Sequence, residues 1–216
     1  MKKSFIVPAL LFLISSTFIP APAHAQEPVA GKDYIEIRNG TPLEPADGKV
    51  VVEEFFNYIC PSCDTFEPLF EAWAKALPSY ARVDLIPATF RPDFKVYARA
   101  YYAAQVLGLV DKTHKAIYKA IHNTHKLPAE GEKIDEARIA QFYSHYGVDA
   151  KKFLTTMKSY RVEIMIRRAT KHMQDCKIPS TPSIVVNGRY LVHANSYQDM
   201  LRIASYLVDK VHKGQL

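Results

Sequence analysis

KVVVEEFFNYICPSC, residues 49–63, is the stretch that decides the fold of this chain. Its first half, 49–56, is a near-continuous run of apolar and β-branched residues, which predicts a buried central strand. The motif Cys60-Pro61-Ser62-Cys63 follows and opens a helix, because Pro61 suits a first helical turn, where its missing N–H costs nothing. The stretch therefore predicts a buried strand that leads into a Cys-x-x-Cys motif at a helix N-terminus.

The segments on either side of this stretch alternate between strand and helix patterns. Residues 34–37 suit a short edge strand, and RVDLIPA at 82–88 suits a second strand after the first helix. From Pro92 to Ile178 the apolar residues recur with the 3.6-residue period of helices. A stretch of that length with one pattern predicts a small helical bundle.

Strand patterns return after this helical stretch. Residues 183–186 and 190–193 flank Asn187-Gly188, which is the strongest short signal for a β-hairpin. Ser196 then suits the N-cap of a last helix. The order of elements predicts an α/β fold in which a helical block separates two strand-containing parts.

The first 25 residues have the pattern of a secretory signal peptide. Lys2 and Lys3 form a positive start, Phe5 to Ile19 is uncharged and mostly apolar, and Ala23-His24-Ala25 is an A-x-A cleavage site. The apolar run is ~15 residues long, whereas a bilayer-spanning helix needs ~20, so cleavage is favoured over a retained anchor. We therefore expect export to a compartment where thiols tend to be oxidised.

Composition narrows the class of protein. The chain has 216 residues, of which 48% are hydrophobic and 23% charged, a balance typical of globular proteins. Its formal net charge of +6 is spread along the chain without a block of consecutive Lys or Arg, so we expect no nucleic-acid partner. Three Cys are too few for a disulfide-dense scaffold.

The Cys-x-x-Cys motif is the main chemical signal. Its spacing places two sulfurs within bonding distance, and the first sulfur faces the free N–H groups and positive end of the helix. That position favours a thiolate, the species that attacks disulfides, so Cys60 is the expected reactive sulfur and Cys63 its resolving partner. A structural disulfide and half a zinc site are the alternatives. A zinc site usually needs a second ligand pair, whereas Cys176 is single, and we expect no metal.

Thr181-Pro182, just before the hairpin, is the second signal. A proline at the start of a strand is either a simple strand-start residue or a cis proline. Together with the dithiol, it favours a cis-Pro loop beside the two cysteines.

These features resemble the DsbA family of thiol:disulfide interchange proteins, within the thioredoxin superfamily. The matching pieces are E-F-F-x-x-x-C-P-x-C at Glu54 to Cys63, Thr181-Pro182, V-N-G at 186–188 and the helical block. The resemblance covers essentially the whole chain after residue 25. It implies an α/β thioredoxin fold interrupted by an inserted helical domain. Residues 26–91 and 179–216 would form the thioredoxin-fold domain and 92–178 the insertion.

The resemblance also implies an activity. A protein of this family oxidises dithiols in the periplasm, donating its disulfide, here Cys60–Cys63, to newly exported proteins that arrive unfolded or reduced. Cys60 would be exposed and Cys63 buried, and the cis-Pro loop at Thr181-Pro182 would contact the substrate peptide. A quinone-linked membrane partner of the DsbB type would reoxidise the protein. We expect a monomer with no cofactor besides its redox-active disulfide. A disulfide isomerase or reductase, or a non-catalytic peptide-binding chaperone module, are the alternatives.

Three glutamates lie close to the dithiol in the sequence. Glu54 lies six residues before Cys60, where the superfamily keeps a buried acid, and we expect it to accept a proton from Cys63 unless it is only an exposed strand-end residue. Strand alternation places Glu53 on the opposite face, and we expect it to be exposed. Glu67, in the first turns of the helix after the dithiol, could add charge near the site, but we expect it to be a solvated surface residue.

The inner dipeptide of the motif differs from that of the best-known family members, and the third cysteine lies outside the motif. The dipeptide Pro61-Ser62 stands where the best-known members of the family carry Pro-His, so the positive charge of the His is missing. Cys176 ends the helical block on its apolar stripe, and we expect a small buried core residue, with a redox-sensing or intermolecular thiol as the alternative.

Overall fold

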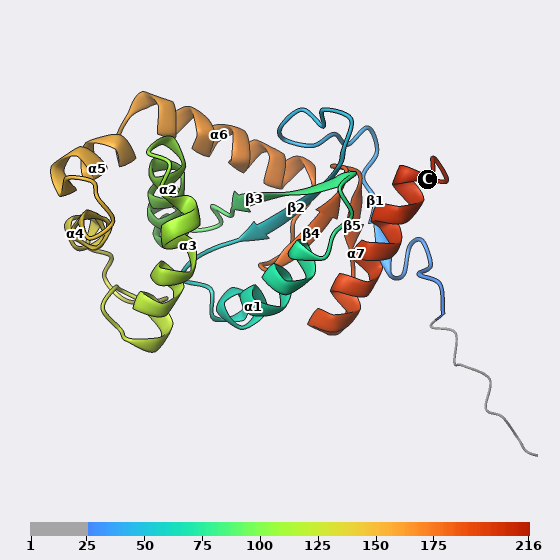
Figure 1. The fold of residues 1–216 in the computed structure, drawn as a ribbon, viewed down its shortest axis with the longest axis horizontal. Coiled ribbons are helices and arrows are strands. Elements are labelled where there is room, and N and C mark those ends of the chain that lie inside the picture. The colour runs from blue at the N-terminus through green and yellow to red at the C-terminus, as the bar shows by residue number, and fades with distance from the viewer. Residues whose placement is uncertain (1–25) are drawn as a thin grey trace, which may run out of the picture.

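The computed structural model describes residues 26–216, and the signal peptide expected at 1–25 lies outside the described residues. A five-stranded mixed sheet forms its centre, in the order β1-β5-β4-β2-β3 (Figure 1). Only β2 and β3 run parallel, while the pairs β1–β5, β5–β4 and β4–β2 are antiparallel. The strands are β1 (Tyr34–Glu36), β2 (Val50–Phe56), β3 (Ala81–Pro87), β4 (Ser183–Val186) and β5 (Tyr190–Val192).

Strand β2 is buried along its whole length, as its apolar sequence predicts. It pairs with β3 on one side and β4 on the other, and helices cover both faces of the sheet around it (Figure 1). On one face lie α1 (Pro61–Lys75) and α7 (Tyr197–His212), and on the other lies α6 (Tyr160–Asp175) (Figure 1). The dithiol motif therefore follows directly on a strand that is buried along its whole length.

The helical insertion lies between β3 and β4 and stands beside the sheet (Figure 1). Three of its helices begin with side-chain caps, at Asp135, Asp149 and Ser159. Its apolar residues form one continuous core with the residues around Cys60 and Cys63, so the insertion also supports the active site. It consists of α2 (Pro92–Val106), α3 (Val110–Tyr118), η1 (Lys119–Asn123), α4 (Glu136–Ser144), α5 (Ala150–Met157) and α6.

The hairpin between β4 and β5 forms at Asn187-Gly188, as predicted. Both residues have positive φ angles, 55° and 65°, which the tight turn requires. A side chain at Gly188 would also collide with the backbone of Thr41, so the glycine lets the 41–45 loop pack closely against the turn.

Within residues 26–216, none of the helices combines the length and the apolar character that crossing a bilayer requires.

Candidate active site

The two cysteines of the motif lie at the N-terminus of α1 as a free dithiol. Cys60 is the N-cap residue, and Cys63 follows in the first helical turn, with its N–H donating to the Cys60 carbonyl over 3.1 Å. The expectation that Cys60 is exposed is wrong, because it is buried with 7% of its surface exposed, whereas the expected burial of Cys63 is complete. An incoming thiol therefore meets the sulfur of Cys60 and not that of Cys63.

The surroundings give the two thiols very different pKa values. A hydrogen bond from Cys63 lowers the pKa of Cys60 to about 6, and the Thr181 side chain and the backbone N–H groups of Cys63 and Ser62 also lower it. Burial raises the pKa of Cys63 above its ordinary value, and its hydrogen bond to Cys60 and the charges of Cys60 and Glu54 add to this. The reduced site is thus a Cys60 thiolate beside a Cys63 thiol.

The Thr181–Pro182 loop lies against this dithiol. Its peptide bond is cis, as predicted. Strand β4 begins directly after it, and Ser183 pairs with Phe55 of β2, which brings the loop to the end of β2 where the dithiol follows. The Cys60 thiol lies 3.4 Å from the carbonyl oxygen of Thr181 and can donate to it.

Ser62 is exposed at the rim of the site. It acts on Cys60 through its backbone N–H, and its own carbonyl oxygen accepts a hydrogen bond from the Tyr197 hydroxyl over 3.1 Å. Position 62 thus faces solvent next to the reactive sulfur.

Glu54 is a buried carboxyl group under the dithiol. Only 1% of its surface is exposed, and neither of its oxygens has a hydrogen-bond partner among the described residues. Burial raises its pKa well above the ordinary value, and the nearby charges of Glu67 and Cys60 raise it further. The carboxyl group of Glu54 therefore holds a proton more tightly than a carboxyl group in water would.

The expectation that Glu53 is exposed is wrong. Glu53 is completely buried on the opposite face of β2, where its Oε1 accepts hydrogen bonds from His172 (2.9 Å) and from the N–H of Leu43 (2.7 Å). The alternation of the strand is as expected, but α6 covers this face as well. Glu53 therefore ties the sheet to the helical insertion and to the 41–45 loop.

The expectation that Glu67 is a solvated surface residue is also wrong. Its Oε2 lies 3.3 Å from Nε2 of His114, and both side chains are about nine-tenths buried. The Nδ1 atom of His114 in turn lies 2.9 Å from the Tyr58 hydroxyl. The sequence reasoning missed His114, because only the tertiary fold brings α3 against α1. The four-residue spacing from Cys63 to Glu67 was a usable signal, since it places both on one helix face.

Cys176 is buried, with 2% of its surface exposed, which confirms its expected place in the core. Burial raises the pKa of its thiol to about 12, and the charges of Glu53 and Asp175 add to the effect. A thiol in that state is protonated and unreactive at neutral pH.

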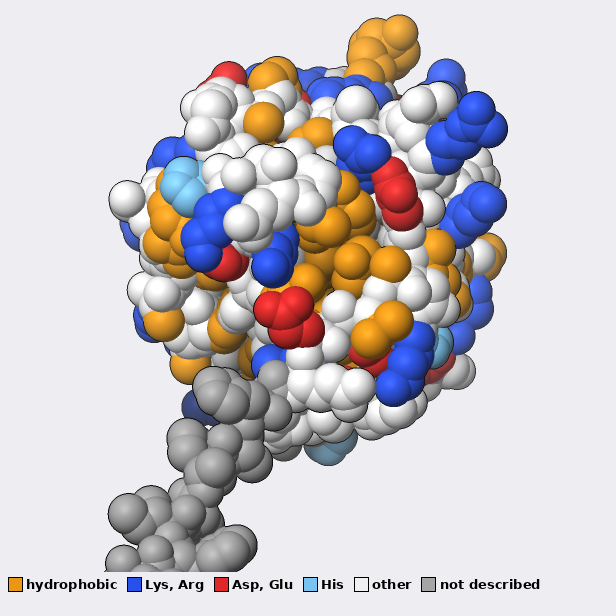
Figure 2. Space-filling model, turned by 90° about the vertical axis from the view of Figure 1, so that its right-hand side faces the viewer, with side chains coloured by type: hydrophobic (Ala, Val, Ile, Leu, Met, Phe, Trp, Pro, Cys, Tyr) orange, Lys and Arg blue, Asp and Glu red, His pale blue; other side chains and the backbone are white. Residues whose placement is uncertain are grey.

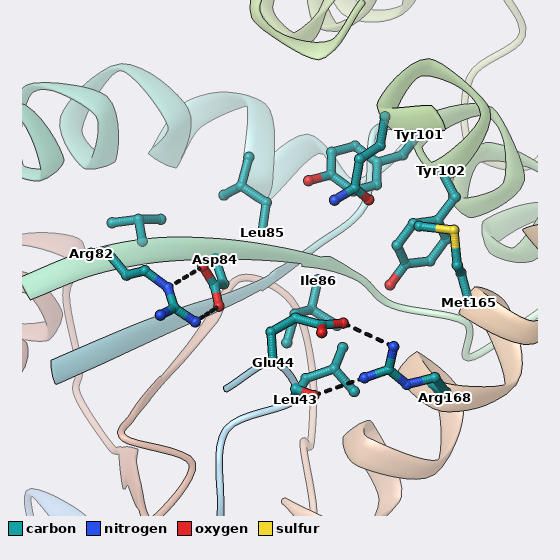
Figure 3. A pocket seen from close by; sticks show the side chains of 12 residues that line it. Leu43, Glu44, Arg82, Asp84, Leu85, Ile86, Tyr101, Tyr102, Met165 and Arg168 are labelled. Carbon is teal, nitrogen blue, oxygen red and sulfur yellow. Dashed lines mark hydrogen bonds and ion pairs between the residues drawn. The ribbon is translucent and has the colours of Figure 1, made fainter. Parts of the chain in front are cut away.

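Other surface features lie apart from the dithiol. A cavity at the edge strand β3 is lined by residues of α2 and α6, and its two arginines are paired, Arg82 with Asp84 and Arg168 with Glu44 (Figure 3). The end of the molecule that carries α7 and β1 shows Lys and Arg scattered around central hydrophobic side chains (Figure 2). Among residues 26–216, no group of three or more His, Cys, Asp or Glu is arranged to hold a metal ion.

The site is a dithiol at a helix N-terminus, with one thiolate, one buried thiol and a cis-Pro loop that faces them. These features define a thiol:disulfide oxidoreductase of the thioredoxin fold. In agreement, the family described as Thioredoxin matches residues 45–204. The chain belongs to the DsbA family of thiol:disulfide interchange proteins, and it is a thiol:disulfide oxidoreductase.

Two relatives and one solved structure carry this assignment. The chain is 31% identical to the thiol:disulfide interchange protein DsbA of Pseudomonas aeruginosa, over 96% of each chain. It is 32% identical to the DsbA of Burkholderia cepacia, over 100% of each. The structure of the oxidoreductase DsbA from Xylella fastidiosa superposes with a TM-score of 0.84 at 37% identity, covering 87% of this chain and 100% of that one.

Proposed function

We propose that this protein is a dithiol oxidase of the periplasm, which donates the Cys60–Cys63 disulfide to newly exported proteins. The observation that carries the proposal is the separation of the two thiols: Cys60 with its pKa lowered to about 6, and Cys63 with its pKa raised. A site that stabilises the Cys60 thiolate stabilises the reduced form, and a protein whose reduced form is stabilised is an oxidant.

The first step is attack on the disulfide. A substrate thiolate attacks Sγ of Cys60, the Cys60–Cys63 bond breaks, and its electron pair goes to the sulfur of Cys63. Because Cys63 has a raised pKa, this sulfur takes up a proton, and the buried carboxyl group of Glu54 is the proposed donor. The product is a mixed disulfide between the substrate and Cys60.

The second step releases the oxidised substrate. A second substrate thiolate attacks the substrate sulfur of the mixed disulfide, and Cys60 leaves as a thiolate with the electron pair. The low pKa of Cys60 favours this step, since a thiol of low pKa leaves faster.

The cis-Pro loop supplies the proposed contact with the substrate peptide. The carbonyl oxygen of Thr181 lies next to Sγ of Cys60, where the substrate chain has to pass. Pro61 and Ser62 form the outer rim of the same site and are both exposed.

A quinone-linked membrane protein of the DsbB type would reoxidise the dithiol after each turnover. The protein would work as a monomer, with its disulfide as the only redox group. Residues 26–91 and 179–216 would act as the thioredoxin-fold domain and 92–178 as the insertion, after removal of a signal peptide at 1–25.

The test uses the mature protein with its disulfide formed. We expect it to oxidise a reduced two-cysteine peptide stoichiometrically, and its dithiol–disulfide equilibrium with glutathione to lie far toward the dithiol. The variant with both Cys60→Ser and Cys63→Ser should still bind the peptide but not oxidise it. An equilibrium on the disulfide side, with activity on scrambled disulfides only from the reduced form, would instead show an isomerase or reductase.

A further inference from the structure

Strand β3 forms one edge of the sheet and runs toward the dithiol. Among residues 26–216, β2 is the only strand that pairs with it. Its last residue, Pro87, is the register partner of Phe56, and Cys60 follows shortly after Phe56 in the chain. Because β2 and β3 are parallel, a chain that lies along β3 leads to the end of the sheet that carries the dithiol (Figure 1).

Part of the β3 backbone faces outward along this edge. A parallel ladder uses alternate residues of each strand, and the N–H of Ala88 donates to the carbonyl oxygen of Phe56 over 2.7 Å. This bond assigns the even-numbered residues of β3 to the β2 side. The N–H and C=O groups of Val83 and Leu85 therefore point away from the sheet. Both residues are only partly buried, so a further strand can reach these groups.

The cavity described above borders this edge on the α6 face of the sheet. It has a volume of about 310 Å³, and the side chains of Tyr102 from α2 and Met165 from α6 line it opposite β3 (Figure 3). Both arginines of its lining are held in ion pairs with carboxylates. The rest of the lining is aromatic and apolar, so this cavity suits an apolar or aromatic side chain.

A groove between α1 and α3 borders the same edge on the opposite face, with a volume of about 380 Å³. Its charged lining consists of three carboxyl groups, one lysine and one histidine: Glu67, Glu71, Asp111, Lys115 and His114. Lys115 is paired with Glu71, and His114 contacts Glu67. The exposed Asp111 is left without a cationic partner in the lining, so this groove suits a basic side chain.

A strand added to this edge would direct its side chains alternately to the two faces of the sheet. A residue opposite Val83 or Leu85 would point toward the α1–α3 groove, and a residue opposite Asp84 would point toward the cavity on the α6 face. The two linings therefore favour a segment in which basic and apolar residues alternate. Pro87 has no N–H group, so the pairing ends before it and the bound segment is short.

We propose that the β3 edge binds an extended segment of the unfolded exported protein that is being oxidised, as an added strand in which basic and apolar residues alternate. The edge holds this chain while its second cysteine reaches the mixed disulfide at Cys60. The identity of the bound chain as a substrate rests on the proposed function, whereas the edge and its two grooves do not.

A second copy of this protein fits the edge less well. If two β3 edges paired in antiparallel fashion about a twofold axis, both α1–α3 grooves would lie on the same side of the joined sheet. The Asp111 carboxylates of the two copies would then face one interface without a cation between them. Like charges at an interface cost free energy, so an unfolded basic segment is the better partner.

The experiment measures the binding of a cysteine-free peptide to the mature protein with its disulfide formed. The peptide is short, with lysine and leucine in alternation, and the amide signals of Val83 and Leu85 are followed by NMR during the titration. One control peptide carries glutamate in place of lysine. A second is N-methylated at alternate residues, which removes the N–H groups that pair with β3 and leaves the protein unchanged.

The protein variants are Val83→Pro and Asp111→Asn, each folded as judged by its melting curve. Val83→Pro removes an outward N–H and keeps the ladder with β2. We expect this variant and the N-methylated peptide each to weaken binding at least about tenfold, because strand pairing is lost. Asp111→Asn should weaken it about two- to fivefold, and less so at high salt. Asp209→Asn, an exposed residue of α7, is the matched control and should bind as the parent does.

A kinetic measurement connects the edge to oxidation. A two-cysteine peptide with the alternating segment attached should show a lower KM than the same peptide without it, at an unchanged kcat. Val83→Pro should raise the KM of the extended peptide to that of the short one and leave the short one unaffected. A general structural defect would instead slow the oxidation of both peptides.

The outcomes separate this inference from the proposed function. If the peptide shifts amides around Thr181 and not those of β3, or if Val83→Pro and N-methylation leave its affinity unchanged, the inference is wrong and the proposed function stands. If the peptide binds at β3 but the two-cysteine peptides are not oxidised, the proposed function is wrong, and with it the assignment of the bound chain as a substrate. A concentration-dependent dimer that Val83→Pro abolishes would assign the edge to a second copy and overturn the inference.

Discussion

The sulfur of Cys60 lies 3.4 Å from the carbonyl oxygen of Thr181, a residue 121 positions further along the chain. The pairing of β2 with β4 creates this contact, because each residue follows or precedes one of those two strands. The whole helical insertion lies between these two residues in the sequence, yet they are in contact in the folded protein. Reactivity at Cys60 therefore depends on the correct closure of the sheet as well as on the helix that carries it.

The exposure of the two sulfurs predicts which variant traps substrate. Cys63→Ala should accumulate mixed disulfides with exported proteins. Cys60 can still form a disulfide with a substrate cysteine, but no second sulfur of the motif is left to resolve it. Cys60→Ala should accumulate few, since Cys63 is completely buried. The adducts are counted on a non-reducing gel of the periplasmic fraction, and similar amounts in the two variants would contradict the assignment of roles.

Stability should depend on redox state and pH together. The folded pKa of Cys60, about 6, lies below that of an unfolded thiol, so the thiolate stabilises the reduced fold. This contribution is complete above an unfolded pKa of ~8.5, is roughly 1–2 kcal/mol at pH 7, and is lost as the pH falls through the folded pKa. The disulfide closes a very short loop and stabilises the oxidised protein less than a long-range bridge would.

We therefore expect the melting temperature of the reduced protein to rise relative to that of the oxidised protein between pH 5 and pH 8.5, and to exceed it from neutral pH upward. Melting curves with and without reductant at pH 5, 7 and 8.5 provide the measurement. A difference that stays constant across this range would mean that the thiolate does not stabilise the reduced fold.

A positive charge at position 62 should strengthen the oxidant. Ser62 is exposed beside Cys60, so Ser62→His fits without disturbing the core and brings an imidazolium near the thiolate. We expect the pKa of Cys60 to fall further below about 6 and the equilibrium with glutathione to move further toward the dithiol. The ultraviolet absorbance of the thiolate, titrated against pH, measures the change. Ser62→Asn is the neutral control and should leave the pKa of Cys60 close to that of the parent.

Cys176 should behave as a core residue. Its thiol is buried and protonated at neutral pH, so it should resist alkylation in the native protein and react only after unfolding. The measurement uses protein with Cys60 and Cys63 oxidised, so that Cys176 is the one free thiol of residues 26–216. Rapid labelling of the native form by a thiol reagent would instead indicate an accessible, redox-sensing cysteine.

The buried pair of Glu53 and His172 should contribute to stability but not to the dithiol chemistry. Glu53→Gln and His172→Gln each leave a buried partner poorly paired, at a cost of about 1–3 kcal/mol in the free energy of unfolding. The double variant should lose less than the sum of the two, because the second change removes a partner already lost. Denaturant titration measures these costs, and additive losses would show that the two side chains do not interact.

Local signals in the sequence determined a large part of this protein. Four of these signals act within a few residues and appear as predicted: the apolar run of β2, the proline in the first turn of α1, the Asn187-Gly188 hairpin and the cap at Ser196. The dithiol and the cis proline were recognisable for the same reason, since each is defined by neighbours in the chain.

The tertiary structure decided the environments of the carboxyl groups. Strand alternation separates Glu53 from Glu54, but whether a face meets solvent depends on α6, whose residues lie more than a hundred positions away. Likewise, nothing near Glu67 in the sequence announces that α3 will place His114 against it. Burial and charge act through space, so the pKa of a side chain follows from every element packed around it. The sequence by itself thus determined which sulfurs react, and only the folded molecule decided how their protons are held.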